Sequence, residues 1–259
     1  MNRRDFITLL GGAAAWPLSA YAQAKLWRIG LLDTIPPAPN TSNLAALRKG
    51  LSDFGYVEGR NLAIEYRSSN GNDVRFDDFA AELLRLKVDL IVTRGTPALL
   101  AAKRATATIP VVMAAIGEPM LAVASIARPG GNVTGLSAFV TDLQAKRVEL
   151  LKDMIPAIRR IGVLFNMGNP VMPPQWKEIE TAAHALRLEP LLFDVRSGAD
   201  IDKAFDAAAS RHIDALVVSV ESLTQANADH IAALAISHRL PTIYASREFV
   251  EVGGLLIST

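Results

Sequence analysis

A turn of three residues, Gly95-Thr96-Pro97, is the stretch of this chain with the clearest binding chemistry. It follows Val88–Val92, a branched, apolar run typical of a buried parallel strand. Glycine permits a sharp turn, Thr96 is a suitable N-cap, and proline is favoured at the first helical position, so we expect a helix to begin here. Unpaired backbone N–H groups at a helix start bind anions. The turn is therefore a candidate carboxylate site, with an ordinary strand–helix connection as the alternative.

Further candidates follow from the rule that ligands of parallel α/β sheets bind at the carboxyl ends of the strands. Glu118 or Glu221 would hold an ammonium group, and Tyr244 would stack on a ring or cover an apolar side chain. Each candidate also has a purely structural interpretation. Tyr244 would be a core residue, Glu221 the charge at a helix start, and Asn166, another candidate at a strand end, a turn-forming residue. The ligand-binding residues that we predict are Asp33, Thr34, Gly95, Thr96, Gly117, Glu118, Ser137, Asn166, Glu221, Tyr244 and Ser246.

Residues for catalysis or metal binding form no motif in this sequence. The four histidines fall in or beside predicted helices, on polar faces, and no two of them have the spacing of a metal-binding pair. A nucleophile elbow, a phosphate-binding loop and a dinucleotide fingerprint are all missing. Asp77 and Asp78 are adjacent in a predicted helix and so do not face each other. We therefore predict a protein that is not an enzyme, with no metal and no cofactor.

Alternating strands and helices must position the candidate residues, and this alternation predicts an α/β fold with doubly wound parallel sheets. The strands are expected at 27–33, 61–67 (nearer a sheet edge), 88–92, 109–116, 133–139, 161–166, 188–195, 213–220, 241–246 and 253–259. The helices are expected at 43–54, 73–86, 97–106, 120–127, 142–155, 173–186, 200–210 and 223–237.

The two halves of the chain resemble each other, which predicts two similar lobes. Arg28–Leu32 (RIGLL) matches Arg160–Leu164 (RIGVL), and Val88–Val92 (VDLIV) matches Ile213–Val217 (IDALV). Any two doubly wound sheets have the same order of strands and helices, so that order alone is weak evidence for a repeat. The aspartate at the second position of both VDLIV and IDALV is explained less well in this way. Two lobes that face each other would form a cleft, where ligand pockets commonly lie.

The first 22 residues are predicted to be an export signal. Arg3-Arg4 precede a short apolar region, and Ala20-Tyr21-Ala22 fits a cleavage site. The paired arginines followed by Phe6 resemble a twin-arginine signal, with the general secretory route as the alternative. The apolar region is short for a membrane anchor and contains two glycines and a proline. We expect the mature chain to lie in a periplasm.

Composition narrows the classes of partner. The 259 residues are half hydrophobic, with a net charge of +1 and no basic block, so nucleic acid is not an expected partner. The chain has no cysteine, which excludes disulfides, thiolate metal sites and the lipid attachment of a bacterial lipoprotein. We therefore expect no membrane anchor once the signal is removed.

Several stretches spread over the chain resemble the solute-binding proteins of bacterial ABC importers, in the subfamily related to aromatic amino-acid binders. They are 3–18, 55–61 (GYVEGRN), 95–97 (GTP), 128–135 (RPGGNVTG) and 244–250 (YASREFV). The resemblance implies a type I periplasmic-binding fold, with two lobes joined by three crossing segments. It also implies closure on a small amino-acid-like or carboxylate solute, and delivery of that solute to a membrane permease.

Two departures from the family pattern stand out. The family usually has Gly-Asp-Pro where this chain has Gly117-Glu118-Pro119 and again where it has Val220-Glu221-Ser222. Family members also continue past the point that matches Thr259, so we expect an incomplete C-terminus. The predicted organisation is an export signal at 1–22, an N-terminal lobe at 23–139, and a C-terminal lobe with the start of a crossing segment at 140–259. An exported α/β enzyme and a ligand-presenting sensor domain are the alternatives.

Overall fold

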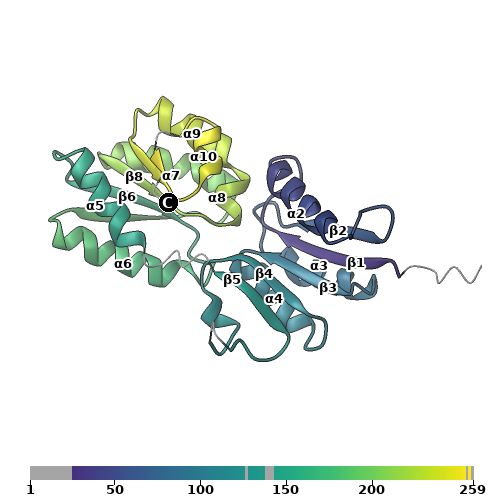
Figure 1. The fold of residues 1–259 in the computed structure, drawn as a ribbon. Helices are drawn as coiled ribbons and strands as arrows, with labels where there is room; N and C mark the ends of the chain where they lie inside the picture. Colours follow the sequence, from purple (N-terminus) through teal and green to yellow (C-terminus); the bar gives the residue numbers. More distant parts are fainter. Residues whose placement is uncertain (1–24, 126–127, 138–142, 255, 258–259) are drawn as a thin grey trace, which may run out of the picture.

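Two parallel sheets organise the chain. The computed structural model describes residues 25–125, 128–137, 143–254 and 256–257. These residues form two bodies that lie side by side, each built on a five-stranded sheet (Figure 1). We call the body that contains β1–β5 lobe one and the body that contains β6–β10 lobe two. The predicted α/β class with two doubly wound parallel sheets is confirmed. The signal at 1–22 and the lobe boundary at 139/140 lie outside the described residues and stay predictions.

Lobe one has the strand order β2-β1-β3-β4-β5, so β2 is at an edge, as predicted. Helices α3 and α4 pack on one face of the sheet, around Phe76, Leu83 and Leu99, and α2 covers part of the other through Leu44. The elements are β1 (Trp27–Asp33), α2 (Thr41–Asp53), β2 (Leu62–Ser68), α3 (Arg75–Arg85), β3 (Leu90–Arg94), α4 (Thr96–Ala105), β4 (Val111–Ile116), the 3₁₀ turn η1 (Pro119–Leu121) and β5 (Val133–Ser137).

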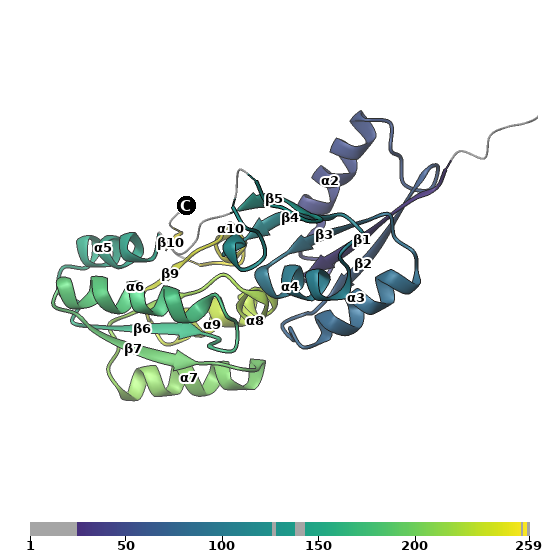
Figure 2. The same cartoon turned by 90° about the horizontal axis from the view of Figure 1, so that it is seen from below.

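Lobe two has the order β7-β6-β8-β9-β10, the same winding as lobe one. Helices α5 and α6 cover one face of its sheet, and α7 and α9 cover the other (Figure 2). The elements are α5 (Gln144–Met154), β6 (Arg160–Phe165), α6 (Met172–Ala185), β7 (Glu189–Asp194), α7 (Gly198–Ser210), β8 (Ala215–Val218), α8 (Ser222–Ala226), α9 (Ala228–Ser237), β9 (Thr242–Tyr244), α10 (Arg247–Glu251) and β10 (Leu256–Ile257).

The internal repeat appears in matching hydrogen bonds as well as in strand order. Asp89, just before β3, accepts the backbone N–H of Arg28 at 2.9 Å. Asp214, just before β8, accepts the backbone N–H of Arg160 at the same distance. Each aspartate thereby binds the start of the first strand of its own lobe, β1 or β6. The aspartate shared between the two halves of the sequence therefore has one structural role, used twice.

Two predicted helices differ from the structure. The helix expected at 223–237 is broken into α8 and α9, because the Asn227 side chain donates to the Leu223 carbonyl at 2.8 Å and competes with helical bonding. Of the helix expected at 120–127, the described residues 120–125 contain only part of the 3₁₀ turn η1, and the Ser125 hydroxyl bonds both backbone groups of Arg128. The short helix α10 was not predicted. No helix in the described part of the chain is long and apolar enough to cross a membrane.

Candidate functional site

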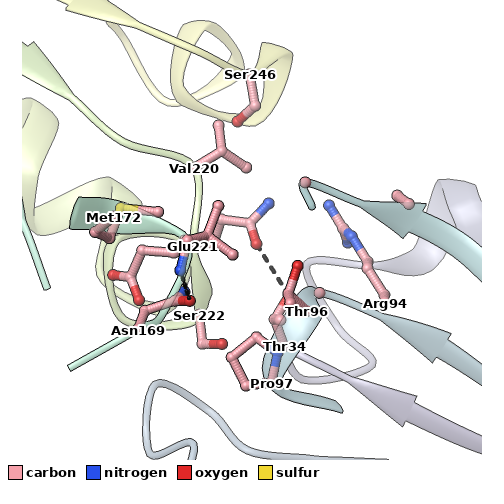
Figure 3. Close-up of a pocket in the computed structure, with 15 residues that line it drawn as sticks. Thr34, Arg94, Thr96, Pro97, Asn169, Met172, Val220, Glu221, Ser222 and Ser246 are labelled. Atoms are coloured by element: carbon pink, nitrogen blue, oxygen red, sulfur yellow. Dashed lines mark hydrogen bonds between the residues drawn. The ribbon is translucent and has the colours of Figure 1, made fainter. Parts of the chain in front are cut away.

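A cavity of about 130 Å³ lies between the lobes, at the carboxyl ends of strands from both sheets. Figure 3 shows Arg94, Thr96 and Pro97 on one side of it, with Met172 and Glu221 on the other. The lining residues are Thr34, Arg94, Gly95, Thr96, Pro97, Ala115, Gly117, Asn169, Val171, Met172, Val220, Glu221, Ser222, Gln225 and Ser246. The cavity therefore combines polar groups from both lobes with an aliphatic surface.

The start of α4 forms the wall of lobe one. Gly95, and not Thr96 as predicted, is the N-cap, and Thr96 is the first helical residue. Glycine suits this position because its φ is +88° and a Cβ there would lie 2.7 Å from Thr34 Cγ2. The Thr96 hydroxyl instead accepts the backbone N–H of Glu118, at 3.4 Å. No side chain caps α4, so its N-terminus is presented to the cavity.

Asp33 supports this wall from behind. It is buried, accepts the Asn40 amide at 2.8 Å and the Ile35 backbone N–H at 3.1 Å, and lies 3.8 Å from the Arg94 guanidinium. Burial raises the pKa of Asp33, and the Arg94 charge acts in the opposite direction. Asn40 also accepts from Arg94 at 3.2 Å. Asp33 is therefore placed to hold Arg94, and it is Arg94 that lines the cavity.

Glu221 is the acidic residue of the wall of lobe two. It is the N-cap of α8, where its Oε1 accepts the Thr224 backbone N–H at 2.9 Å. Its Oε2 is buried with no hydrogen-bond partner. The pKa of Glu221 is raised to about 7, chiefly by burial; the Thr224 backbone N–H lowers it, and the negative charge of Asp73 contributes to the rise. The hydroxyls of Ser222 and Ser246, on the same wall, are also buried without a partner.

Helix α8 of lobe two contacts lobe one. The Thr34 hydroxyl donates to the Gln225 amide oxygen across the lobes, at 2.9 Å (Figure 3). Below this bond the chain is close-packed, because a Cβ on Gly71 of lobe one would lie 3.3 Å from the Ala226 Cβ. Residues of α8 therefore contact lobe one beside the cavity.

Six of the predicted ligand-binding residues line the cavity: Thr34, Gly95, Thr96, Gly117, Glu221 and Ser246. The other five, Asp33 among them, do not. Glu118 lies next to the lining residue Gly117. The Ser137 hydroxyl donates to the Ile116 carbonyl at 3.2 Å. Asn166 lines a neighbouring hollow, and Tyr244 is buried and stacked on Phe249 with ring centroids 4.6 Å apart.

Several lining residues were not predicted. Arg94 is the last residue of β3, so the strand-end rule could have identified it. Ser222 follows a predicted residue directly. Asn169 and Met172 lie beyond the end of β6, and Gln225 lies inside a helix, so no local pattern marks them. Among the described residues, no group of three or more His, Cys, Asp and Glu side chains is arranged to hold a metal ion.

Comparisons with known proteins found relatives in sequence and in fold. The chain is 28% identical over 209 residues to a tyrosine-binding protein of Clostridioides difficile, a match that covers 80% of this chain and 60% of that protein. It is similar to a crystal structure of an ABC domain in complex with L-Trp from Streptococcus pneumonia, with a TM-score of 0.78, 26% identity, and coverage of 90% of this chain and 79% of that one. A conserved domain protein of Vibrio cholerae gives a TM-score of 0.80 at 25% identity, over 89% and 78% of the two chains.

The match to a protein-family model extends over most of the sequence. The chain spans about 60% of the length of the curated relative it matches. A leucine-binding protein of Thermotoga maritima, only 14% identical, shares the fold with a TM-score of 0.65. The family model described as ABC transporter substrate binding protein matches residues 40–258, which include both walls of the cavity. The protein therefore belongs to the ABC transporter substrate-binding protein family.

Proposed function

We propose that this protein binds a small amino-acid-like or carboxylate solute in the cavity between its lobes. The observation that carries the proposal is the uncapped start of α4 at Gly95-Thr96, which lies beside Arg94 on one wall of that cavity. A helix start and a guanidinium are both suited to a carboxylate. The relatives named after tyrosine and L-Trp support an amino-acid-like ligand.

The opposite wall supplies the rest of the proposed site. The unpaired oxygens of Glu221, Ser222 and Ser246 are buried at the cavity, where a polar group without a partner is costly. A ligand with an amine or hydroxyl group would satisfy them. Met172 and Val220 provide an aliphatic surface for the remainder of the solute. The predicted contacts of Glu118, Ser137, Asn166 and Tyr244, together with that of Asp33, stay predictions outside the cavity lining.

Thermal unfolding of the full chain with amino acids and carboxylates, one at a time, tests the proposal. A ligand at one hundred times its Kd stabilises the folded state by about 2.7 kcal/mol, so a true ligand raises the Tm. Thr96→Val, which removes the hydroxyl at the helix start, should lower the affinity for that ligand. Lys177→Ala, an exposed change on α6, is the control. No shift with any compound would contradict the proposal, and product formation would favour an enzyme instead.

We further propose that the protein works in a periplasm and passes its solute to the permease of an ABC importer. Membership of the family supports a transport role, and the sequence of residues 1–22 supports export. N-terminal sequencing of protein from the periplasmic fraction should find Gln23 as the first residue. Deletion of the gene should reduce uptake of the solute identified by thermal unfolding, and normal uptake would argue for a sensor role.

A further inference from the structure

Two carboxylates, one from each lobe, lie at the contact between α8 and lobe one. Asp73 belongs to lobe one, two residues before α3, and Glu221 belongs to lobe two, directly before α8. Glu221 is 5% exposed, and Asp73 is half-buried. The negative charge of Asp73 acts on Glu221. Like charges in a poorly solvated place oppose each other's ionisation, so this contact favours a protonated carboxyl group.

The groups around the pair do not neutralise it. In its own lobe, Glu221 faces the backbone N–H groups of Thr224 and Leu223 and the side chain of Asn166. From lobe one it faces Asp73, which in turn faces the hydroxyls of Ser69 and Ser222. Neither Ser222 nor Asn166 makes a hydrogen bond of ordinary geometry to these carboxylates, since Ser222 Oγ and Glu221 Oε2 are both unpaired. The largest influences on Glu221 are burial, backbone N–H groups and the charge of Asp73, and no cation is among them.

Two arginines lie near, and each has an acidic neighbour. Arg94 is on the far wall of the cavity, where it lies 3.8 Å from Asp33. Arg196 lines the adjoining hollow together with Asp73, and it forms an exposed ion pair of 2.8 Å with Asp194. A proton is therefore the simplest means of removing the charge from Glu221 while the lobes are in contact.

We propose that the lobes of this protein close more readily when Glu221 is protonated, so that the Asp73–Glu221 pair links closure to the uptake of one proton from solvent. The contact between α8 and the loop around Gly71 brings the two acids together. Separation of the lobes would move Glu221 away from Asp73 of lobe one, and the pKa of Glu221 would then fall toward the ordinary range of a glutamate. The inference rests on the proposed function only in requiring that the lobes open and close.

The sign of the effect follows from linkage. The carboxyl of Glu221 has a higher pKa in the closed arrangement than in the open one, so protons stabilise the closed arrangement. This stabilisation is fully present below the ordinary pKa of glutamate and is lost as the pH rises through about 7. The equilibrium constant for closure should therefore be about tenfold larger at pH 6 than at pH 8.

Distance measurement between spin labels on the ligand-free full chain tests this inference. The chain has no cysteine, so Ser52→Cys on α2 and Lys177→Cys on α6, both exposed, give one label on each lobe. The short-distance population should increase from pH 8 to pH 6. Glu221→Gln should abolish this dependence, whereas Asp206→Asn, an exposed change on α7, should leave it intact.

A second variant protects the test against failure of the first to fold. Asp73→Asn removes the opposing charge without touching the cap of α8, and it should move the midpoint of the transition to lower pH. Equal distance distributions of the unsubstituted labelled chain at pH 6 and pH 8, or the same pH dependence in Glu221→Gln, would overturn the inference. Because no ligand is present, these outcomes are separate from a failure to find a solute.

Discussion

The Thr34 hydroxyl and the Gln225 amide oxygen are joined by a 2.9 Å hydrogen bond that crosses from one lobe to the other. Thr34 follows β1 of lobe one, and Gln225 lies in α8 of lobe two, 191 residues later in the chain. The bond lies at the cavity that we propose as the solute site. Contacts of this kind determine how strongly the two walls are held together without a ligand.

A double-mutant cycle measures this contact. Thr34→Val and Gln225→Met each remove one partner while nearly conserving volume, and the coupling energy should be about 0.5–1.5 kcal/mol in urea unfolding. Thr41→Val is the control, because its hydroxyl donates to Ala38 within lobe one. The cycle of Thr41 with Gln225 should show no coupling. Additive effects in the Thr34 cycle would mean that the bond does not contribute to stability.

Gly95→Ala should destabilise the fold at the wall of lobe one. The φ of +88° and the 2.7 Å approach to Thr34 Cγ2 both oppose a side chain. We expect a loss of about 1–3 kcal/mol in the free energy of unfolding. Gly50→Ala is the matched control, since Gly50 lies in α2 with no atom within 4 Å, and alanine there should stabilise by about 0.5–1 kcal/mol. Equal stability of Gly95→Ala and the parent would show that the backbone relaxes freely.

The stability of the protein should depend on pH through Glu221. Its pKa is about 7 in the folded protein and near the ordinary value when unfolded, so the folded state favours the protonated form. The corresponding stabilisation is complete at low pH and is lost as the pH rises through 7. Between pH 5 and pH 8 the free energy of unfolding should fall by about 2 kcal/mol more in the parent than in Glu221→Gln. Parallel pH profiles from urea titrations would contradict this assignment.

Tyr244 should behave as a core residue. It is 1% exposed and stacked on Phe249 with an interplanar angle of 15°. Tyr244→Phe preserves the stack and should leave solute affinity unchanged, while Tyr244→Ala should cost about 3–5 kcal/mol of stability. Chemical denaturation and the ligand screen measure the two quantities. A loss of solute affinity in a stable Tyr244→Phe variant would restore the predicted ligand contact.

The sequence predicted the scaffold better than the site. Buried strands such as Trp27–Asp33 are apolar and branched, so their location follows from local composition. The repeated Asp89 and Asp214 indicated two similar halves because each fixes the same strand start. Gln225 reaches the cavity only through the packing of one lobe on the other, which no local pattern encodes, whereas Arg94 could have been identified as the last residue of β3. The N-cap at Gly95 depends likewise on its contact with Thr34.

The repeat places Gly95-Thr96 and Glu221-Ser222 at equivalent positions, each as the N-cap and first residue of the helix that follows the third strand of its sheet. The two walls are thus related by an approximate symmetry in the backbone, but their chemistry differs. One helix start is left open, and the other is closed by its own acidic side chain. An elongated solute with unlike ends would therefore meet two unlike walls and enter in a single orientation.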